Sequence, residues 1–593
     1  MLQLKIKNLL EQGLELFNNS KFDDAEKIYK EIIKLDNKNS DSYCALGTVN
    51  AMRKKYKEAL NFFLITIKLE PKNYFAFNNL GSICFKFQKF NEALEYYSKA
   101  IIIKPNYILA INMRALTYEK LNDLEKALKD YNQIKLLEPS GKYIDGLILL
   151  TKAKLCLWNG FGYTLNKCRK KNEKKIIAWE PLISLIFEAS LENHKKTLDL
   201  FIKDKMSTVG DIFTHIKNNK KKIRLGYFSA DFYNHAVSLL IARIFELHNK
   251  DSFEVYGFAL HKPTFKDTIR DRIIKSFDEF YDLEEMTDLE VINLTRSKDI
   301  DIAIDLTGFT NGNRANIFFN RIAPIQINFL GYPGSVGLKN MDYIIADKIL
   351  IPEKDKNFYR EKIIFMPDSY QANDNTKKIS DRIFTRKELG LPEDSFIFCC
   401  FNSPHKITPE IFKTWVKIIS KVNNSVLWLY VLNEQTIKNL KKEMTKNFLS
   451  EDRIIFAKKM DLELHLARLK FADVCLDTLP YNGHTTTSDA LWAGVPVLTC
   501  IGKTFAGRVS ASLLTACNMK ELITNNLKEY ENLAVDLAIN TNKLYNIKNK
   551  LNNNNKTLKL FNSEIFTKNL EMAYKSVYKN YHLDLPNEEV YIL

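Results

Sequence analysis

The chain has 593 residues, more than one hydrophobic core usually organises, so several domains are expected. Its residues are 46% hydrophobic, 12% aromatic and 27% charged, which excludes a disordered, collagen-like or low-complexity chain. The net charge of +16 fits an anionic partner or merely a lysine-rich surface, so charge alone selects no function.

The cysteine pattern and the apolar runs bear on the compartment. The nine cysteines are scattered and form no CxxC pair or zinc-type spacing, which indicates a reducing compartment. Residues 1–17 interrupt their apolar pattern with acidic residues and lack the core of a signal peptide. No apolar run reaches the roughly 18 residues that suggest a membrane span. We therefore expect a cytoplasmic protein with no membrane partner.

A period of 34 residues runs through the first quarter of the chain. Four columns recur at this spacing: Gly13, Gly47, Gly81 and Ala115; Ala25, Ala59, Ala93 and Ala127; Tyr29, Phe63, Tyr97 and Tyr131; and Pro71, Pro105 and Pro139. Each unit is predicted to form two amphipathic helices that approach at the small residues and end at the proline.

These columns resemble the tetratricopeptide repeat, with about four units in residues 1–141. The first unit departs from the pattern at Asn37, where its neighbours have proline. The resemblance implies a concave groove that holds a protein or peptide, here a polypeptide substrate. A spacer or a surface for homo-oligomer formation is the alternative.

Residues 142–220 keep a helical pattern but lose the period, which predicts a helical connector. Their basic clusters, KCRKKNEKK and KNNKKKIR, lack interleaved aromatic residues. This composition favours a solvated, charged surface, and no nucleic-acid partner is expected.

From residue 222, short β-type runs alternate with helical stretches, a pattern typical of parallel sheets covered by helices. The first series is KIRLGYFS, SFEVYGFAL, DIAIDLTGF, PIQINFLGY and MDYIIAD; the second is FIFCCFN, SVLWLYVL, RIIFAK, ADVCLDT and VPVLTC. We predict two Rossmann-like α/β lobes, residues 221–382 and 383–593, the second closed by C-terminal helices. Ligands of such sheets bind beyond the carboxyl ends of the strands.

Two segments of the second lobe have the chemistry of a phosphate site, although neither a Walker sequence nor GxGxxG occurs. Lys406 follows the predicted strand FIFCCFN and precedes a helix start at Thr408. A cation beside a helix N-terminus can hold a diphosphate, and a plain surface lysine is the alternative.

The second segment follows ADVCLDT, where a loop containing His484 opens a helix at Thr485 and Thr486. The first turn of that helix offers hydroxyls and free N–H groups to phosphate oxygens. Asp489, on the same helix, can accept hydrogen bonds from a ribose. A simple helix cap explains the threonines and the acid, but it does not explain His484.

Ordered blocks along nearly the whole chain resemble the O-linked N-acetylglucosamine transferase family and its SPINDLY-like relatives. Besides the repeats, the blocks are SADFYNHAVS, LTGFTNGNRANIFFNRIAPIQINFLGYPGSVG, FNSPHKITP, ADVCLDTLPYNGHTTTSDALWAGVPVLT and GRVSASLL. The resemblance implies a GT-B fold with UDP-N-acetylglucosamine between its two lobes. It also implies an inverting transfer to a serine or threonine hydroxyl, without a metal or a cofactor.

The resemblance implies two catalytic residues, His235 and Lys406. Lys406 matches the lysine that neutralises the diphosphate leaving group, and His235 matches a histidine near the sugar and the acceptor. The general base is left open, because a phosphate oxygen or a relayed water can also take the proton.

The resemblance also implies a set of donor-binding residues: His465, Arg468, His484, Thr485, Thr486 and Asp489. The turn that begins at His484 is implied to contact the diphosphate, and Asp489 the ribose. His465 matches the histidine associated with the uracil, with Arg468 one helical turn further on.

No metal site is expected, because the sequence Asp299-Ile-Asp301 heads a predicted strand and reads as a strand boundary.

The chain departs from the family pattern at Ser403, Leu462 and Leu239, which replace a glutamine, a lysine and a histidine. Two alternatives stay open. One is a GDP-fucose transferase of the SPINDLY type, whose equivalent turn typically has glycine at the position of His484. The other is a repeat scaffold with an inactive transferase domain.

Overall fold

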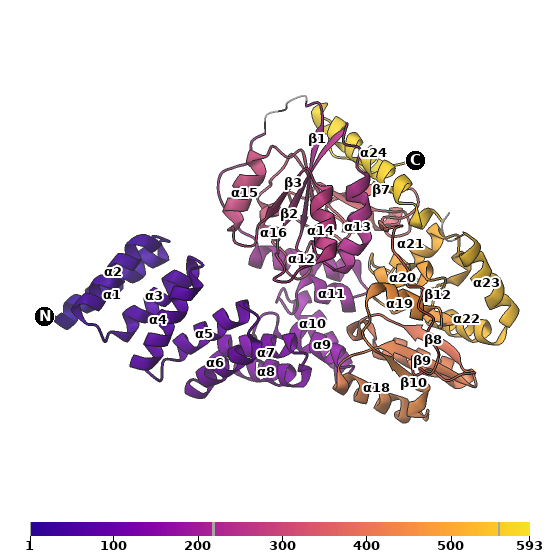
Figure 1. The fold of residues 1–593 in the computed structure, drawn as a ribbon, viewed down its shortest axis with the longest axis horizontal. Coiled ribbons are helices and arrows are strands. Elements are labelled where there is room, and N and C mark those ends of the chain that lie inside the picture. The colour runs from indigo at the N-terminus through magenta and orange to yellow at the C-terminus, as the bar shows by residue number, and fades with distance from the viewer. Residues whose placement is uncertain (1, 216, 218–219, 555–557) are drawn as a thin grey trace. The chain divides into compact units, whose positions relative to one another are not determined.

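The computed structural model describes residues 2–215, 217, 220–554 and 558–593 (Figure 1). The chain folds as two compact units, residues 1–151 and 152–593. Part of the second basic cluster, residues 218 and 219, lies outside the described residues.

The first unit is a helical array whose consecutive helices pack against one another. Its helices are α1 (Leu2–Asn18), α2 (Phe22–Leu35), α3 (Ser40–Met52), α4 (Tyr56–Leu69), α5 (Tyr74–Lys86), α6 (Phe90–Ile103), α7 (Ile108–Lys120) and α8 (Leu124–Leu137). The predicted tetratricopeptide repeats are confirmed.

The glycine and aromatic columns explain how the two helices of a repeat approach. A Cβ atom added at Gly47 would lie 2.7 Å from the Phe63 ring, and one at Gly81 would lie 2.7 Å from the Tyr97 ring. The rings therefore occupy the space that any side chain at these glycines would need. The predicted close contact is present at both repeats.

Helices between the array and the first sheet are α9 (Ile144–Lys154), α10 (Phe161–Glu173), α11 (Pro181–Phe187) and α12 (Leu191–Lys205). The last three form part of the second unit. A buried network holds them together, because Thr197 Oγ1 accepts hydrogen bonds from Asn172 Nδ2 at 2.6 Å and from Trp179 Nε1 at 3.1 Å.

The first lobe contains a parallel sheet with the strand order β14-β7-β6-β5-β4-β1-β2-β3. The strands are β1 (Ile223–Ser229), β2 (Phe253–Ala259), β3 (Glu279–Asp282), β4 (Ile302–Asp305), β5 (Ile325–Asn328), β6 (Tyr343–Ala346), β7 (Lys362–Phe365) and β14 (Val590–Tyr591). Its helices are α13 (Ala236–Leu247), α14 (Thr268–Ser276), α15 (Asp288–Ser297), α16 (Ala315–Phe319) and the 3-10 helix η1 (Glu353–Phe358).

The second lobe contains a parallel sheet with the strand order β10-β9-β8-β11-β12-β13. The strands are β8 (Phe396–Cys400), β9 (Ser425–Tyr430), β10 (Ile454–Ala457), β11 (Val474–Leu476), β12 (Val497–Cys500) and β13 (Ile523–Thr524). The α-helices are α17 (Pro409–Lys421), α18 (Glu434–Lys446), α19 (Leu462–Leu469), α20 (Thr485–Trp492), α21 (Val509–Ala516), α22 (Leu527–Ile539), α23 (Thr541–Asn554) and α24 (Ser563–His582). Short 3-10 helices are η2 (Pro404–Lys406), η3 (Glu451–Arg453), η4 (Lys520–Leu522) and η5 (Lys559–Phe561).

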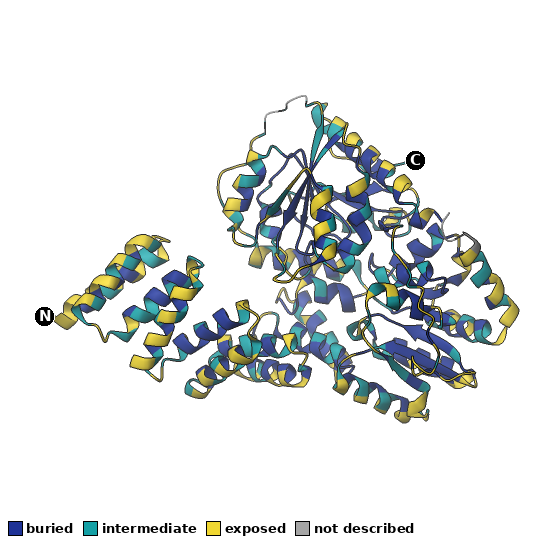
Figure 2. Ribbon diagram, in the orientation of Figure 1, coloured by how far each residue is buried: buried dark blue, intermediate teal, exposed yellow. Residues whose placement is uncertain are grey.

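Both sheets share the order of a dinucleotide-binding fold, in which the third, second and first strands are followed by the fourth, fifth and sixth. Their central strands are buried on both faces, as Figure 2 shows, which explains why they read as continuous apolar runs. The predicted class, tetratricopeptide helices followed by two Rossmann-like lobes in a GT-B fold, is confirmed.

The end of the chain returns to the first lobe, which differs from the assignment of residues 383–593 to the second lobe alone. Strand β14 pairs with β7, and α24 packs against α13 (Figure 1). Buried polar contacts hold the helix there: Tyr574 Oη lies 3.1 Å from Tyr227 Oη, and Glu571 Oε1 lies 3.0 Å from His248 Nδ1.

Candidate active site

Most of the predicted site residues follow the carboxyl ends of strands at the points where the strand order reverses, whereas His465 and Arg468 follow the edge strand β10. In the second lobe this point lies between β8 and β11, and in the first lobe between β1 and β4. Lys406 comes after β8 and His484 after β11, whereas His235 comes after β1. Doubly wound sheets bind ligands at such points, so the topology explains why these segments are candidates.

Lys406 is held across the switch point by the loop that follows β11. Its Nζ donates a hydrogen bond to the carbonyl of Asn482 at 3.0 Å and lies 4.1 Å from the centre of the Tyr481 ring. Burial lowers the pKa of Lys406 to about 8, and the nearby Asp477 carboxylate opposes this shift. The ammonium is therefore poorly solvated and is suited to an anionic ligand.

Asp477, directly after β11, organises the loop that bonds to Lys406. Its Oδ1 accepts hydrogen bonds from the backbone N–H groups of Thr478 at 2.8 Å and Gly483 at 2.6 Å. Thr499 Oγ1 donates to Oδ2 at 2.7 Å. Burial raises the pKa of Asp477, and these hydrogen bonds oppose the rise. The carboxylate thus fixes both ends of the loop from residue 478 to 483.

His484 caps the start of α20 and contacts the same loop. Its ring stacks on Tyr481, with centroids 4.8 Å apart, and its Nε2 lies 3.3 Å from the carbonyl oxygen of Ala506. Burial, reinforced by the charge of Lys406, lowers the pKa of His484 well below its ordinary value. A neutral imidazole therefore stands beside the lysine at neutral pH.

The first turn of α20 is partly buried and is tied to the end of β8. Thr486 Oγ1 donates a short hydrogen bond to Asn402 Oδ1, and Asn402 Nδ2 donates to Thr478 Oγ1 at 2.9 Å. Thr485, the first residue of α20, is partly exposed. The first turn of α20 has free N–H groups, and Lys406 bonds to the loop that leads into it.

His465 and Arg468 form a second group, on α19. The Arg468 Nε donates to His465 Nδ1 at 3.1 Å, and both side chains pack against the ring of Phe401. Burial lowers the pKa of His465 to about 4 and that of Arg468 to about 10. The charge of Arg468 lowers the histidine pKa further, and that of Asp489 opposes it, so α19 and α20 interact electrostatically.

Asp489 is buried on α20 and is paired with a cation that no sequence motif indicated. Lys377 Nζ donates to Asp489 Oδ1 at 2.9 Å. Lys377 belongs to the segment that connects β7 of the first lobe to β8 of the second.

His235 belongs to the first lobe, whereas Lys406 belongs to the second. It is the N-cap of α13, and its Nδ1 accepts a long hydrogen bond of 3.4 Å from the N–H of Val237. The same Nδ1 lies 3.5 Å from Asp231 Oδ2, and 41% of the histidine side chain is exposed. Burial raises the pKa of Asp231, and His235 opposes the rise. An accessible imidazole with a neighbouring carboxylate follows the first strand.

The carboxylates of Asp299 and Asp301 lie at the amino end of β4. Lys220 Nζ lies 2.8 Å from an oxygen of each, and the N–H of Arg224 donates to Asp301 at 2.8 Å. These contacts fit a structural role at the strand boundary. Among the described residues, no three His, Cys, Asp or Glu side chains gather as metal ligands would.

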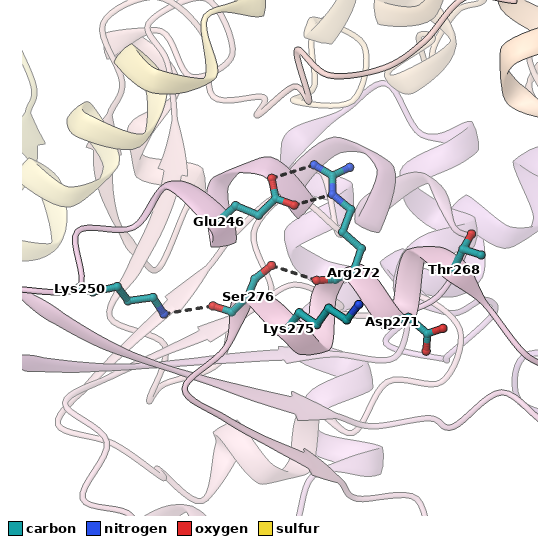
Figure 3. A pocket seen from close by; sticks show the side chains of 7 residues that line it. All are labelled: Glu246, Lys250, Thr268, Asp271, Arg272, Lys275 and Ser276. Carbon is teal, nitrogen blue, oxygen red and sulfur yellow. Dashed lines mark hydrogen bonds and ion pairs between the residues drawn. The ribbon is translucent and has the colours of Figure 1, made fainter.

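A hollow of about 600 Å³ on the first lobe contains none of the predicted residues. Figure 3 shows its lining: Glu246, Lys250, Thr268, Asp271, Arg272, Lys275 and Ser276. The guanidinium of Arg272 is shared between Glu246, at 2.6 Å, and Asp374, at 2.5 Å. The hollow is therefore built around an internal ion-pair network.

Sequence reasoning missed Asp477, Asn402, Tyr481 and Lys377. The first three could have been predicted from the sequence. Asp477 is an acidic residue at the end of the apolar strand ADVCLDT, and Asn402 and Tyr481 lie in the two loops that follow predicted strands. Lys377 gives none, because it belongs to no motif and reaches Asp489 only in the folded chain.

The chain consists of tetratricopeptide helices followed by two Rossmann-like lobes, each with a switch point in its sheet. This arrangement defines a repeat protein with a GT-B domain. The chain belongs to glycosyl transferase family 41, whose sequence profile matches residues 204–381 and 373–570. Tetratricopeptide profiles match residues 10–73, 74–107 and 109–140.

Curated relatives support this membership. The chain is 37% identical over 360 residues to the Arabidopsis thaliana protein described as probable UDP-N-acetylglucosamine–peptide N-acetylglucosaminyltransferase SEC, covering 60% of this chain and 37% of that protein. It is 26% identical over 484 residues to the Caenorhabditis elegans UDP-N-acetylglucosamine–peptide N-acetylglucosaminyltransferase, covering 63% and 42%. The chain thus spans about two fifths of the length of these relatives.

A solved structure of a Thermobaculum terrenum O-GlcNAc transferase variant has the same fold. The two structures superpose with a TM-score of 0.61 at 22% identity, over 98% of this chain and 99% of that one. Within the part of the chain that the structure describes, no helix is long and apolar enough to cross a membrane.

Proposed function

We propose that this chain transfers N-acetylglucosamine from UDP-N-acetylglucosamine to serine and threonine hydroxyls of polypeptides. The observation that carries the proposal is the hydrogen bond from Lys406 to the Asn482 carbonyl, in the loop that leads into α20 at the switch point of the second sheet, in a member of family 41. A cation and free N–H groups at that point suit a sugar-linked diphosphate.

In the proposed reaction the acceptor hydroxyl attacks the anomeric carbon, the sugar–phosphate bond breaks and UDP leaves with inversion. Lys406 and the first turn of α20, with His484, Thr485 and Thr486, stabilise the charge that develops on the diphosphate. This stabilisation needs no metal. The proton of the acceptor passes to His235 or to a phosphate oxygen of the donor.

The remaining site residues are proposed to bind the nucleoside. Asp489 has a buried carboxylate for the ribose, and the group of His465 and Arg468 offers a neutral ring and a donor for the uracil. Because burial keeps His465 neutral at physiological pH, its ring can pack against a base without the cost of a buried charge.

We further propose that the tetratricopeptide array holds polypeptide acceptors and that the protein works in the cytoplasm. The nine scattered cysteines, which include no CxxC pair, support a reducing compartment. Formation of a homo-oligomer through the array is the alternative use of this surface.

Incubation of the full chain with a panel of UDP- and GDP-sugars and a peptide mixture tests the proposal. UDP-N-acetylglucosamine is expected to release UDP and to add one N-acetylglucosamine to serine or threonine, as read by mass spectrometry. Calorimetry that finds no uridine nucleotide bound at millimolar concentration would contradict the proposal. Turnover of GDP-fucose instead would point to a fucosyltransferase, and peptide binding without turnover would point to a scaffold.

The affinity for UDP is expected to fall with rising pH, because the free protein loses the Lys406 proton near pH 8. If only the ammonium form binds, the protonated fraction, and with it the affinity, falls about tenfold between pH 7 and pH 9. Calorimetry across this range measures the slope. Lys406→Arg keeps its charge and should give a flat profile, and equal slopes for the two proteins would contradict the assignment.

A further inference from the structure

Lys377 stands out because it is a nearly buried cation whose described partner is one oxygen of a carboxylate. Its side chain is 4% exposed and that of Asp489 is 10% exposed. The ammonium donates to Oδ1 of Asp489 at 2.9 Å. Within the described residues, no donor contacts Oδ2 of Asp489 and no second acceptor contacts Lys377 Nζ.

The position of Lys377 is fixed by contacts that its own segment makes with both lobes. Three residues earlier, Asp374 accepts from Arg272 on α14, the arginine of the hollow in Figure 3. Asn373 Oδ1 accepts a short hydrogen bond from Ser488 on α20. Three residues later, the N–H of Ser380 donates to the carbonyl of Glu463 on α19 at 3.1 Å.

Within the described residues, the Lys377 ammonium and Asp489 Oδ2 therefore have hydrogen-bonding capacity that is left to solvent or to a ligand. A ligand that bridges this pair offers a donor to Asp489 and an acceptor to Lys377 within one short span. A vicinal diol does so, since one hydroxyl can donate to the carboxylate and its neighbour can accept from the ammonium.

We infer that Lys377 and Asp489 together clamp the 2′- and 3′-hydroxyls of the donor ribose, so that Lys377 is a donor-binding residue contributed by the segment between the lobes. This inference rests on the proposed function and adds a residue to it. This segment is hydrogen-bonded to α14 in the first lobe and to α19 and α20 in the second. A bound ribose would therefore contact the segment that connects the two lobes.

The experiment compares UDP with 2′,3′-dideoxy-UDP by calorimetry, using the full-length protein. Lys377→Gln keeps a hydrogen-bond donor but removes the charge. We expect it to weaken UDP binding about tenfold and to leave dideoxy-UDP binding unchanged, because a charge-assisted hydrogen bond to the ribose is lost. Lys378→Gln, the next residue along and exposed, is the matched control and should change neither affinity.

The outcomes separate the inference from the proposed function. Equal affinity of wild type and Lys377→Gln for UDP, or equal weakening for both nucleotides, overturns the diol clamp and leaves the proposed function standing. Failure of the wild-type protein to bind UDP overturns the proposed function and the clamp with it.

Lys377→Gln leaves the Asp489 carboxylate without its cation, which can destabilise the fold. A second comparison controls for this effect. The double variant Lys377→Gln with Asp489→Asn is neutral at both positions. If it binds UDP about threefold or more weakly than Asp489→Asn alone, the direct contact of Lys377 with the ligand is supported. Equal affinity of these two variants means that Lys377 acts only on Asp489, and it overturns the clamp.

Discussion

Lys406→Ala is expected to lower kcat/KM for sugar transfer by about a thousandfold or more while the protein stays folded. Removing one preorganised donor to a developing anion costs about a hundredfold to a thousandfold, and here the donor also carries a full charge. Stability should be kept, since burial of the ammonium is unfavourable by itself, as the lowered pKa of about 8 indicates. Steady-state kinetics and thermal melting measure the two quantities.

Lys413→Ala is the matched control for this substitution. Lys413 is exposed on α17, one helical turn after the start of the helix that follows Lys406, so its loss should leave the rate unchanged. Lys406→Arg should retain a measurable part of the activity because it keeps the charge, with altered geometry. A Lys406→Ala protein that transfers sugar at the wild-type rate would refute the role of Lys406 at the diphosphate.

Much of the architecture was predictable because its sequence signals are local or periodic. The repeat columns place small residues against aromatic rings, as Gly81 and Tyr97 show in space. The strands of the second lobe's centre are buried on both faces, and their continuous apolar runs stand out from the amphipathic helices.

The return of the chain to the first lobe was not predictable in this way. Strand β14 has two residues, too few for any period, and it pairs with β7 more than 200 residues earlier. The buried contact between Tyr574 and Tyr227 likewise joins segments that no local pattern relates. Such elements are determined by tertiary packing and not by propensity.

The residues of the candidate site likewise fall into two groups: those with a local sequence signal and those placed only by long-range contacts. Lys406 and the turn at His484 follow apolar strands, so the strand pattern and phosphate chemistry together point to them. Lys377 lies in a segment without strand, helix or motif, and only the fold brings it to Asp489. Residues that act through long-range contacts therefore need the structure.

Asp477→Ala is expected to abolish UDP binding and to destabilise the second lobe by about 3–5 kcal/mol. The substitution leaves the buried N–H groups of Thr478 and Gly483, and the hydroxyl of Thr499, without the carboxylate that accepts from them. The loop that positions the Asn482 carbonyl against Lys406 should then lose its geometry. Calorimetry with UDP and hydrogen exchange of β11 and α20 measure the two effects.

Asp477→Asn separates the charge of this residue from its hydrogen bonds. The amide oxygen can still accept from the loop N–H groups, so stability should fall by much less than in Asp477→Ala. The carboxylate raises the pKa of Lys406, so its loss should move that pKa below about 8 and shift the decline of UDP affinity to lower pH.

Asp473→Asn is the control on the same strand connection. Asp473 precedes β11 at the opposite, amino end, where it accepts from the N–H of Ile397 at 2.9 Å and pairs with Lys548. Its substitution should lower stability modestly and leave the pH profile of UDP binding in place. If Asp473→Asn and Asp477→Asn shift that profile equally, the cause is the general change in net charge. Asp477 would then have no specific effect on the pKa of Lys406. A shift confined to Asp477→Asn means that one buried carboxylate both builds the loop and keeps the lysine protonated for its anionic ligand.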